Sequence, residues 1–318
     1  MSYPTKPTWR GHLAILRMDH WVKNVFVVPG IVAAFALGSG PVGFALLWPI
    51  LKGIAAMCLV ASSYYTLNEV LDAPYDRGHP IKCHRPVAAG LVIVPLAYVQ
   101  WLGLGVLGVG LGWTVNMPLG LALLGLWLMG CVYNIPPIRT KDLPYLDVIT
   151  ESVNNPLRLL IGWFCIDPGQ APPLSLLLSY WFVGAYFMAV KRFAELREFA
   201  DPVRAAAYRK SFAFYTEQRL LTSLMFYSSA AMLFLGAFTM RYRLELLLAY
   251  PLVALVMAIY FDIAFEENSP AQAPEKLHRE PRLMAAVVLC ALAVALLCFV
   301  DLPWLHRFLI PSVPLPPA

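Results

Sequence analysis

The sequence predicts an all-α, polytopic integral membrane protein with nine transmembrane helices. Hydrophobic residues make up 59% of the 318 residues and charged residues only 14%, and the mean hydropathy is +0.65. This composition lies outside the range of an ordinary soluble domain of this length. Apolar runs of about 17–25 residues, the length that crosses a bilayer as a helix, also recur along the chain. Between these runs, strongly charged loops alternate with nearly uncharged ones.

Nine apolar runs define the predicted transmembrane helices. They cover residues 22–37, 45–66, 91–113, 118–133, 147–166, 174–194, 220–240, 244–264 and 284–300. Short, nearly uncharged loops near Ser39, Asn116 and Pro168 join the first helix to the second, the third to the fourth and the fifth to the sixth. Most of the ionisable residues fall in the loops at 67–90, 134–146, 191–219 and 265–282. We therefore expect one intramembrane domain over residues 1–318, with its polar chemistry on one side.

The distribution of Lys and Arg predicts the orientation. If the N-terminal segment 1–20 is cytoplasmic, 19 of the 24 Lys and Arg lie in cytoplasmic segments, as the positive-inside rule requires. This places the charged loops in the cytoplasm and the proline-rich tail 305–318 outside, in an inner or plasma membrane. The net charge of +5 is explained by this topology and by attraction to anionic lipid or phosphate, so no nucleic-acid partner is expected.

Three polar side chains mark the end of the second apolar run. Asn68, Asp72 and Asp76 follow one another at four-residue spacing. On a helix each such step advances only about 40° beyond a full turn, so all three lie on one face. Mg²⁺ is commonly held by one or two carboxylates together with the phosphates of a substrate, and we predict a Mg²⁺ site here. The alternative is a solvated helix end whose charges only mark the membrane boundary.

A second polar stripe lies inside the fifth predicted helix. Asp147, Glu151, Asn154 and Arg158 fall within about 60° of one another on a helix. Ionisable residues in a membrane span face the bundle interior or a wet cavity and mark a functional site by default. We predict catalytic roles for Asp147 and Glu151, a place for Asp147 among the metal ligands, and phosphate binding by Arg158. The alternative is a structural pair of Glu151 and Arg158, with Asn154 bonding between helices.

Cations occur in the same polar loops. Arg139 and Lys141 follow a proline-broken helix end and are spaced to reach one anion, Arg139 in a bidentate manner and Lys141 as a point charge. A diphosphate is the predicted guest, because Mg²⁺ and cations together stabilise the charge that develops on a departing diphosphate. The other cations in or beside the polar segments are Lys23, Lys82, Arg85, Lys191 and Arg192, and we also count Asn24 and Tyr133 as candidate phosphate contacts.

Two ordered motifs resemble the signatures of the UbiA superfamily of intramembrane prenyltransferases. They are Asn68-x-x-x-Asp72-x-x-x-Asp76 followed by His79-Pro80-x-Lys82-x-x-Arg85-Pro86, and Tyr133-x-x-Pro136-Pro137-x-Arg139-x-Lys141-x-x-Pro144-x-x-Asp147. The resemblance covers essentially the whole chain. It implies nine transmembrane helices around a central cavity, with both motifs in loops or helices that cap the cytoplasmic side.

Two further segments resemble the branch of decaprenyl-phosphate phosphoribosyltransferases within that superfamily. They are Trp21-Val-Lys23-Asn24-Val and Lys191-Arg192-x-x-Glu195. This resemblance implies a Mg²⁺-dependent enzyme that transfers phosphoribose from phosphoribosyl pyrophosphate to a polyprenyl phosphate and releases diphosphate. It also implies that Asn68, Asp72 and Asp76 hold Mg²⁺ and the donor diphosphate. The phosphate contacts that it implies are Lys23, Lys82, Arg85, Lys191 and Arg192.

Other features leave two alternatives open. Asn68 is followed by Glu69 where the first motif usually has Asp, and the second motif looks more like that of the ordinary prenyl-transferring branches. Transfer of a prenyl chain from a prenyl diphosphate to an aromatic or lipid acceptor is therefore the second hypothesis. A transporter or channel is the third, although most charges lie at the cytoplasmic mouth and not at mid-membrane.

Overall fold

The computed structural model describes residues 6–38, 40, 43–78, 82–199, 201–272 and 274–309, and within them all regular secondary structure is helical. The α-helices are α1 Trp9–Ala14, α2 Val28–Leu37, α3 Leu47–Asp76, α4 Val94–Trp113, α5 Met117–Asn134, α6 Leu146–Ser152, α7 Asn154–Phe164, α8 Leu174–Arg197, α9 Pro202–Tyr208, α10 Glu217–Tyr242, α11 Tyr250–Ile263, α12 Pro281–Leu297 and α13 Pro303–Phe308. Shorter 3₁₀ segments are η1 Met18–Val27, η2 Phe44–Leu46, η3 Lys82–His84, η4 Thr140–Asp142, η5 Lys210–Ala213, η6 Leu244–Ala249, η7 Pro270–Gln272 and η8 Pro274–Arg279. The motif residues His79 and Pro80, and the tail from residue 310 onward, lie outside the described residues.

Long apolar helices dominate the fold, as an integral membrane protein requires. Seven helical stretches in the described residues are long and apolar enough to cross a bilayer, namely Trp9–Leu37, Phe44–Asp76, Val94–Trp113, Met117–Asn134, Leu174–Arg197, Glu217–Tyr242 and Leu244–Ile263. They match seven of the predicted spans. The last predicted span corresponds to the apolar but shorter α12, and the fifth differs from the prediction.

The fifth predicted span is not one helix. It is divided into α6 and α7 at Val153. Pro156 has no backbone N–H to donate to the carbonyl of Ser152, and its ring crowds that carbonyl, so the helix breaks there. Asp147 and Glu151 consequently lie on α6, whereas Asn154 and Arg158 lie on α7. The expected continuous polar stripe along a single helix was therefore wrong.

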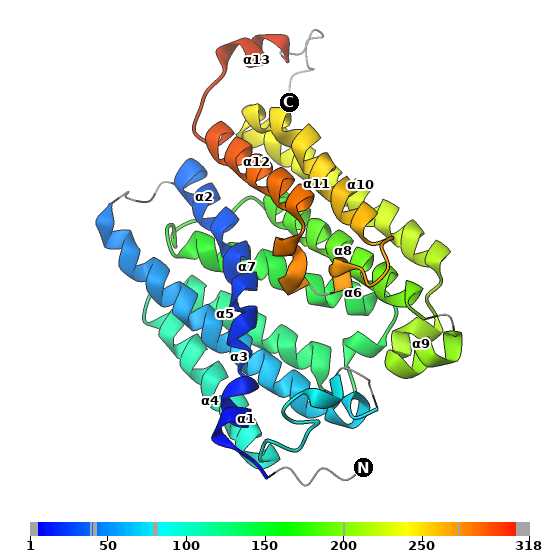
Figure 1. The fold of residues 1–318 in the computed structure, drawn as a ribbon. Coiled ribbons are helices and arrows are strands. Elements are labelled where there is room, and N and C mark those ends of the chain that lie inside the picture. Colours follow the sequence, from blue (N-terminus) through cyan, green and yellow to red (C-terminus); the bar gives the residue numbers. More distant parts are fainter. Residues whose placement is uncertain are drawn as a thin grey trace.

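The helices pack in two groups, which contact each other in the middle of the bundle (Figure 1). One apolar core joins α2, α3, α4, α5 and α7, and another joins α6, α8, α10 and α11 with the cap helix α9. The helices α1 and α13 lie at opposite ends of the bundle in Figure 1.

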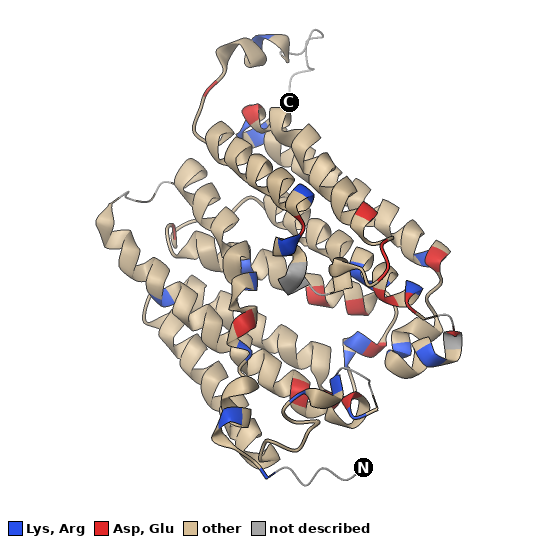
Figure 2. Ribbon diagram, viewed as in Figure 1, with Lys and Arg blue, Asp and Glu red and all other residues tan. Residues whose placement is uncertain are grey.

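Charged residues gather where α3, α5 and α8 end and on α9, while the middle parts of the long helices carry few (Figure 2). The 30 residues of α3 span about 45 Å at 1.5 Å per residue, which exceeds the roughly 30 Å hydrocarbon layer of a bilayer. Its last turns can therefore extend beyond the apolar layer. This length explains how carboxylates at the end of an apolar helix avoid the hydrocarbon.

Two glycines allow α2 and α7 to approach closely. A Cβ on Gly162 would lie 2.2 Å from the carbonyl oxygen of Val27, and a Cβ on Gly30 would lie 2.1 Å from that of Leu159. Any side chain at either position must push the two backbones apart.

We expect Gly162→Ala to lower the free energy of unfolding by about 1–3 kcal/mol, the usual cost of overpacking. Thermal unfolding in detergent measures the effect. The matched control is Gly110→Ala on α4, where a Cβ meets no atom within 4 Å. Because alanine favours helices over glycine, the control should leave stability unchanged or raise it slightly. Equal melting temperatures for the two variants would contradict the close packing of α2 on α7.

Candidate active site

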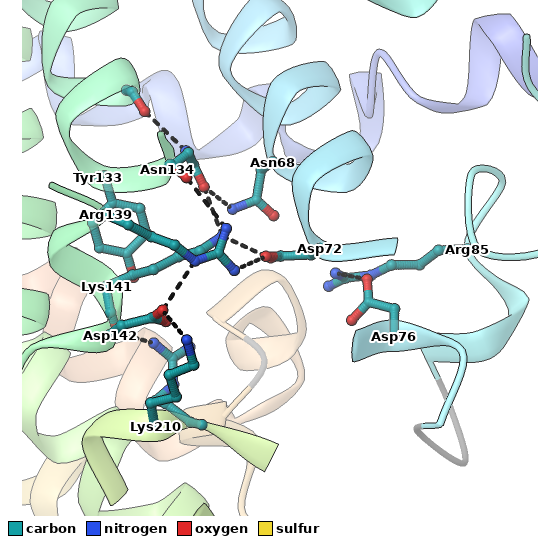
Figure 3. Close-up of polar contacts among 12 residues, drawn as sticks. Asn68, Asp72, Asp76, Arg85, Tyr133, Asn134, Arg139, Lys141, Asp142 and Lys210 are labelled. Carbon is teal, nitrogen blue, oxygen red and sulfur yellow. Dashed lines mark hydrogen bonds and ion pairs between the residues drawn. The ribbon is translucent and has the colours of Figure 1, made fainter. Parts of the chain in front are cut away.

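The site is organised around the carboxylate of Asp72 near the end of α3. Its Oδ1 accepts from Nη2 of Arg139 at 2.9 Å and from Nζ of Lys141 at 2.5 Å (Figure 3). Both cations come from the loop that follows α5, and Lys141 is 5% exposed. The structure thus joins the two sequence motifs through one carboxylate oxygen.

Asn134, the last residue of α5, orders the other side of this cluster. Its Oδ1 accepts from Nδ2 of Asn68 at 2.7 Å and from Nζ of Lys141 at 2.8 Å. Its own Nδ2 donates to the carbonyl of Gly130 at 2.9 Å, which fixes the orientation of the amide. Asn134 is fully buried and was missed by the sequence analysis, although it directly follows Tyr133 in the second motif.

Asp76 lies on the same helix but has a different partner. Its Oδ2 accepts from Nη1 of Arg85 at 2.8 Å, on the loop after η3, and Figure 3 shows no dashed contact between Asp76 and the Asp72 cluster. Among the described residues, no three His, Cys, Asp or Glu side chains lie close enough to hold a metal ion by themselves. Any ion at this site therefore needs oxygen ligands from a substrate or from water.

The loop between α5 and α6 has an unusual backbone that aims its cations. Arg139 and Tyr145 have φ values of 29° and 64°, a region that side-chain-bearing residues seldom adopt. The N–H of Tyr145 donates to the hydroxyl of Tyr215 at 2.6 Å, which holds that turn. Arg139 also donates through Nε to Asp142 at 3.1 Å, so its guanidinium is fixed between two carboxylates.

A second charged cluster lies on α6 and α8. Arg192 donates to Oδ2 of Asp147 and to Oε2 of Glu195, both at 2.9 Å, and its Nη2 lies 3.3 Å from the hydroxyl of Tyr133. Asp147 is fully buried and also accepts from Tyr215 at 2.6 Å. Its oxygens are thus occupied by protein groups. This arrangement does not favour the metal role predicted for Asp147, which stays a prediction.

The segment after α9 adds polar and charged residues to both clusters that the sequence analysis did not single out. Ser211 donates to Asp147 at 3.2 Å, Arg209 lies 3.9 Å from the same carboxylate, and Lys210 lies 3.2 Å from Asp142. Arg209 and Lys210 form a short basic run in a charged loop, and from the sequence alone such a run cannot be distinguished from the Lys and Arg that orient a membrane protein.

The remaining predicted residues have various surroundings. Glu151 accepts from the hydroxyl of Tyr64 at 2.6 Å, and no ion pair with Arg158 is found among the described residues, which does not favour the alternative of a structural Glu151–Arg158 pair. Arg158 Nε and Asn154 Oδ1 are buried without a hydrogen-bond partner among the described residues. Asn24 donates to the sulfur of Cys58 at 3.3 Å.

Three predicted lysines also have defined neighbours. Lys23 Nζ lies 3.0 Å from Nδ1 of His20, and Lys82 donates to the hydroxyl of Tyr208 at 3.0 Å. Lys191 lies 4.0 Å from Glu195, which also holds Arg192. These lysines therefore belong to the second cluster or its border and do not contact Asp72.

Burial changes the acidity of two of the cap lysines. The pKa of Lys141 is lowered to about 8 because burial penalises the ammonium, an effect that the neighbouring Asp72 partly offsets. Burial likewise lowers the pKa of Lys82 to about 8. Both side chains therefore change charge near neutral pH, in contrast to ordinary lysines.

The sequence of the chain decides its family. The model of the UbiA prenyltransferase family matches residues 26–279. The chain belongs to the UbiA prenyltransferase family. The two motifs around Asp72 and Arg139 both lie within the matched region.

The chain is similar to named proteins and to solved structures. A decaprenyl-phosphate phosphoribosyltransferase from Corynebacterium glutamicum is 30% identical over 67% of this chain and 62% of its own length. One from Mycobacterium tuberculosis is 32% identical over 66% of this chain and 67% of its own length. The chain thus covers about two thirds or less of these relatives. A solved UbiA homologue from Archaeoglobus fulgidus bound to DMAPP and Mg²⁺ has the same fold, with a TM-score of 0.69 and 21% identity over 91% of this chain and 99% of that one.

The lowered pKa of Lys141 predicts a pH limit on anion binding. The side chain is a cation below about pH 8 and neutral above it, so diphosphate affinity should fall as pH rises through 8. Loss of one cation weakens binding by up to about tenfold per pH unit. In Lys141→Arg the cation persists, since arginine stays charged, and the decline should shrink to the part contributed by other lysines such as Lys82. Titration calorimetry with Mg²⁺ and inorganic diphosphate measures the affinity at each pH. If the wild type and Lys141→Arg give superimposable pH profiles, Lys141 does not set the pH limit.

The buried pair of Asp147 and Arg192 predicts a stability effect. Asp147→Asn leaves a buried guanidinium with one carboxylate fewer, and we expect a loss of about 3 kcal/mol in the free energy of unfolding. The control is Asp301→Asn, which removes a 78% exposed partner of Arg243 and should cost below about 1 kcal/mol. If Asp147→Asn instead keeps wild-type stability and loses only Mg²⁺-dependent activity, Asp147 is a metal ligand after all.

Proposed function

We propose that this protein is a Mg²⁺-dependent transferase that displaces diphosphate, moving 5-phosphoribose from phosphoribosyl pyrophosphate to a polyprenyl phosphate. The reaction takes place at the Asp72 cluster, on the cytoplasmic side of an inner or plasma membrane, with the N-terminus in the cytoplasm. Relatives named decaprenyl-phosphate phosphoribosyltransferase support this choice of substrates. The cations around Asp72 support diphosphate as the leaving group.

The pairing of two cations with one oxygen of Asp72 carries the proposal. Arg139 and Lys141 lie within 3 Å of Asp72 Oδ1, so both cations can turn to a bound diphosphate with small movements. Arg139 offers parallel N–H groups to phosphate oxygens, and Lys141 offers a compact charge. Held in a buried setting, these donors stabilise the negative charge on a leaving diphosphate much better than water does.

The residues around Asp72 also fit Mg²⁺. Asn68 donates through Nδ2, which leaves its Oδ1 as a ligand, and neither Asp72 Oδ2 nor Asp76 Oδ1 receives a hydrogen bond from the described residues. Asn68, Asp72 and Asp76 would therefore hold the ion, with diphosphate oxygens and water completing its shell. When bound, Mg²⁺ supplies Lewis-acid stabilisation of the diphosphate.

The chain's residues then have separate tasks in the reaction. An oxygen of the lipid phosphate attacks the anomeric carbon of the sugar, a carbon–oxygen bond forms, and the bond to diphosphate breaks with its electron pair. No proton has to be removed from an ionised phosphate, so no side-chain base is required. Arg139 and Lys141 orient the diphosphate, and Arg85 keeps Asp76 in place.

The second cluster would bind the remaining phosphate of the donor sugar. Lys82, Lys191 and Arg192 bring three cations against Glu195 and Asp147. Tyr133 connects the second cluster to the first. Its hydroxyl contacts Arg192, and the next residue in the chain, Asn134, contacts Lys141. A donor with phosphates at both ends could therefore be held between the two clusters.

Transfer assays test the proposal. Purified protein is incubated with Mg²⁺ and labelled phosphoribosyl pyrophosphate, with and without a polyprenyl phosphate, and lipid-soluble label is measured. Asp72→Ala and Asp76→Ala should each lower turnover by about a hundredfold or more, since metal–diphosphate stabilisation commonly contributes several kcal/mol. The exposed Asp301→Ala at the opposite end is the control.

The alternative donor provides the contrary outcome. If no label enters the lipid and the protein instead turns over a prenyl diphosphate with an aromatic or lipid acceptor, the sugar donor is wrong. Near-normal rates for both Asp72→Ala and Asp76→Ala would remove the metal assignment for either donor.

A further inference from the structure

We infer that a pocket of about 360 Å³ beside the Asp72 cluster binds the phosphate head and first isoprene units of the polyprenyl phosphate acceptor. This inference rests on the proposed function and adds the location of the second substrate. The pocket lies between the last turns of α3, the loop after α5, and Lys210 of η5.

The charges in the pocket favour an anion. Lys210 and Arg139 line it together with one carboxylate, that of Asp142. Asp142 lies 3.2 Å from Lys210 Nζ and 3.1 Å from Arg139 Nε, so two cations share one anion. Because the Lys210 side chain is 61% exposed, it can turn from Asp142 to a phosphate without exposing a buried group. Charged hydrogen bonds of this kind are the strong ones in phosphate recognition.

The aromatic ring of Tyr75 holds both cations at the pocket. It lies 5.4 Å from Cζ of Arg139 and 5.8 Å from Nζ of Lys210. Cations over an aromatic face are attracted to it and lose less mobility when an anion binds. The pocket thus has a prearranged positive wall.

The rest of the pocket wall is apolar and open. Leu71, Pro74 and Pro137 line it, and Tyr75, Ile138 and Leu143 are 53%, 57% and 43% exposed. Large apolar side chains exposed together around a pocket mark a binding surface for an apolar ligand or the membrane. A sugar diphosphate has no apolar group to contact this wall. In a polyprenyl phosphate, the phosphate can contact the cations and the isoprenoid chain can contact the apolar wall.

Arg139 connects this pocket to the reacting groups. The same guanidinium contacts Asp142 in the pocket through Nε and Asp72 in the buried cluster through Nη2 (Figure 3). Only the guanidinium of Arg139 therefore separates a lipid phosphate in the pocket from a diphosphate at Asp72. This proximity favours the acceptor over a structural phospholipid as the occupant.

Binding of a radiolabelled polyprenyl phosphate to the detergent-purified protein, without any donor, tests the inference. Lys210→Glu places a negative charge at the head group, and Ile138→Glu places one on the chain path. Each should weaken lipid binding by about tenfold or more, the worth of a charged hydrogen bond. The control Arg204→Glu makes the same charge change at an exposed position of the cap helix α9 and should bind like the wild type. Binding of Mg²⁺ and inorganic diphosphate should be unchanged in Ile138→Glu, which shows that this variant is folded.

Wild-type lipid affinity in both Lys210→Glu and Ile138→Glu would overturn the inference, even if the transfer reaction itself is observed. Equal competition by phosphatidylglycerol would also overturn it, because the pocket would then be a general anionic-lipid site. If the lipid binds as expected but no phosphoribose is transferred, the proposed function fails while the site stands.

Discussion

A single carboxylate oxygen that neutralises two cations organises the polar end of this membrane protein. Charges taken out of water are costly unless they are paired, and Lys141 is almost fully buried. Asp72 therefore has to lie where Lys141 and Arg139 meet, which ties the end of α3 to the loop after α5. The same requirement acts at Arg192, whose burial demands both Asp147 and Glu195 and thereby joins α6 to α8. Pairing of buried charge thus determines how the helix ends are assembled, while apolar packing stabilises the rest of the bundle.

Features that depend on short-range periodicity could be predicted from the sequence. Asn68, Asp72 and Asp76 do lie on one helix, because α3 continues without a break to Asp76. The loop cations Arg139 and Lys141 were also correctly grouped, since both are fixed by the same proline-terminated helix end. The stripe from Asp147 to Arg158 was wrong because periodicity was extended across Pro156. The missing N–H at that position outweighs the apolar pattern. Asp147 and Glu151 on α6 accept from Arg192 and Tyr64, whereas Oδ1 of Asn154 and Nε of Arg158 on α7 have no hydrogen-bond partner among the described residues.

Contacts between distant segments could not be read from local patterns. Ser211 and Tyr215 contact Asp147 from 64 and 68 residues away. Nothing in the sequence from Arg209 to Tyr215 distinguishes it from the other charged loops until the chain is folded. Asn134 was missed for a related reason, since a single amide acquires a role only when Asn68 and Lys141 converge on it. These four contacts show that buried polar groups acquire partners across the fold, which composition and spacing do not encode.

The arrangement around Asp72 also has a consequence for ligand selection. A bare diphosphate that took Arg139 and Lys141 would leave the Asp72 carboxylate partly buried without a cation, and a bare metal ion on Asp72 would leave the two cations unpaired. The binding free energy of either ligand alone is therefore reduced by the cost of the charge that it leaves unpaired. A complex of Mg²⁺ with diphosphate avoids both costs, because its metal compensates Asp72 while its oxygens compensate Arg139 and Lys141. The pairing within the protein thus favours the metal complex of the donor over either component, and it does so before any contact with the sugar or lipid is made.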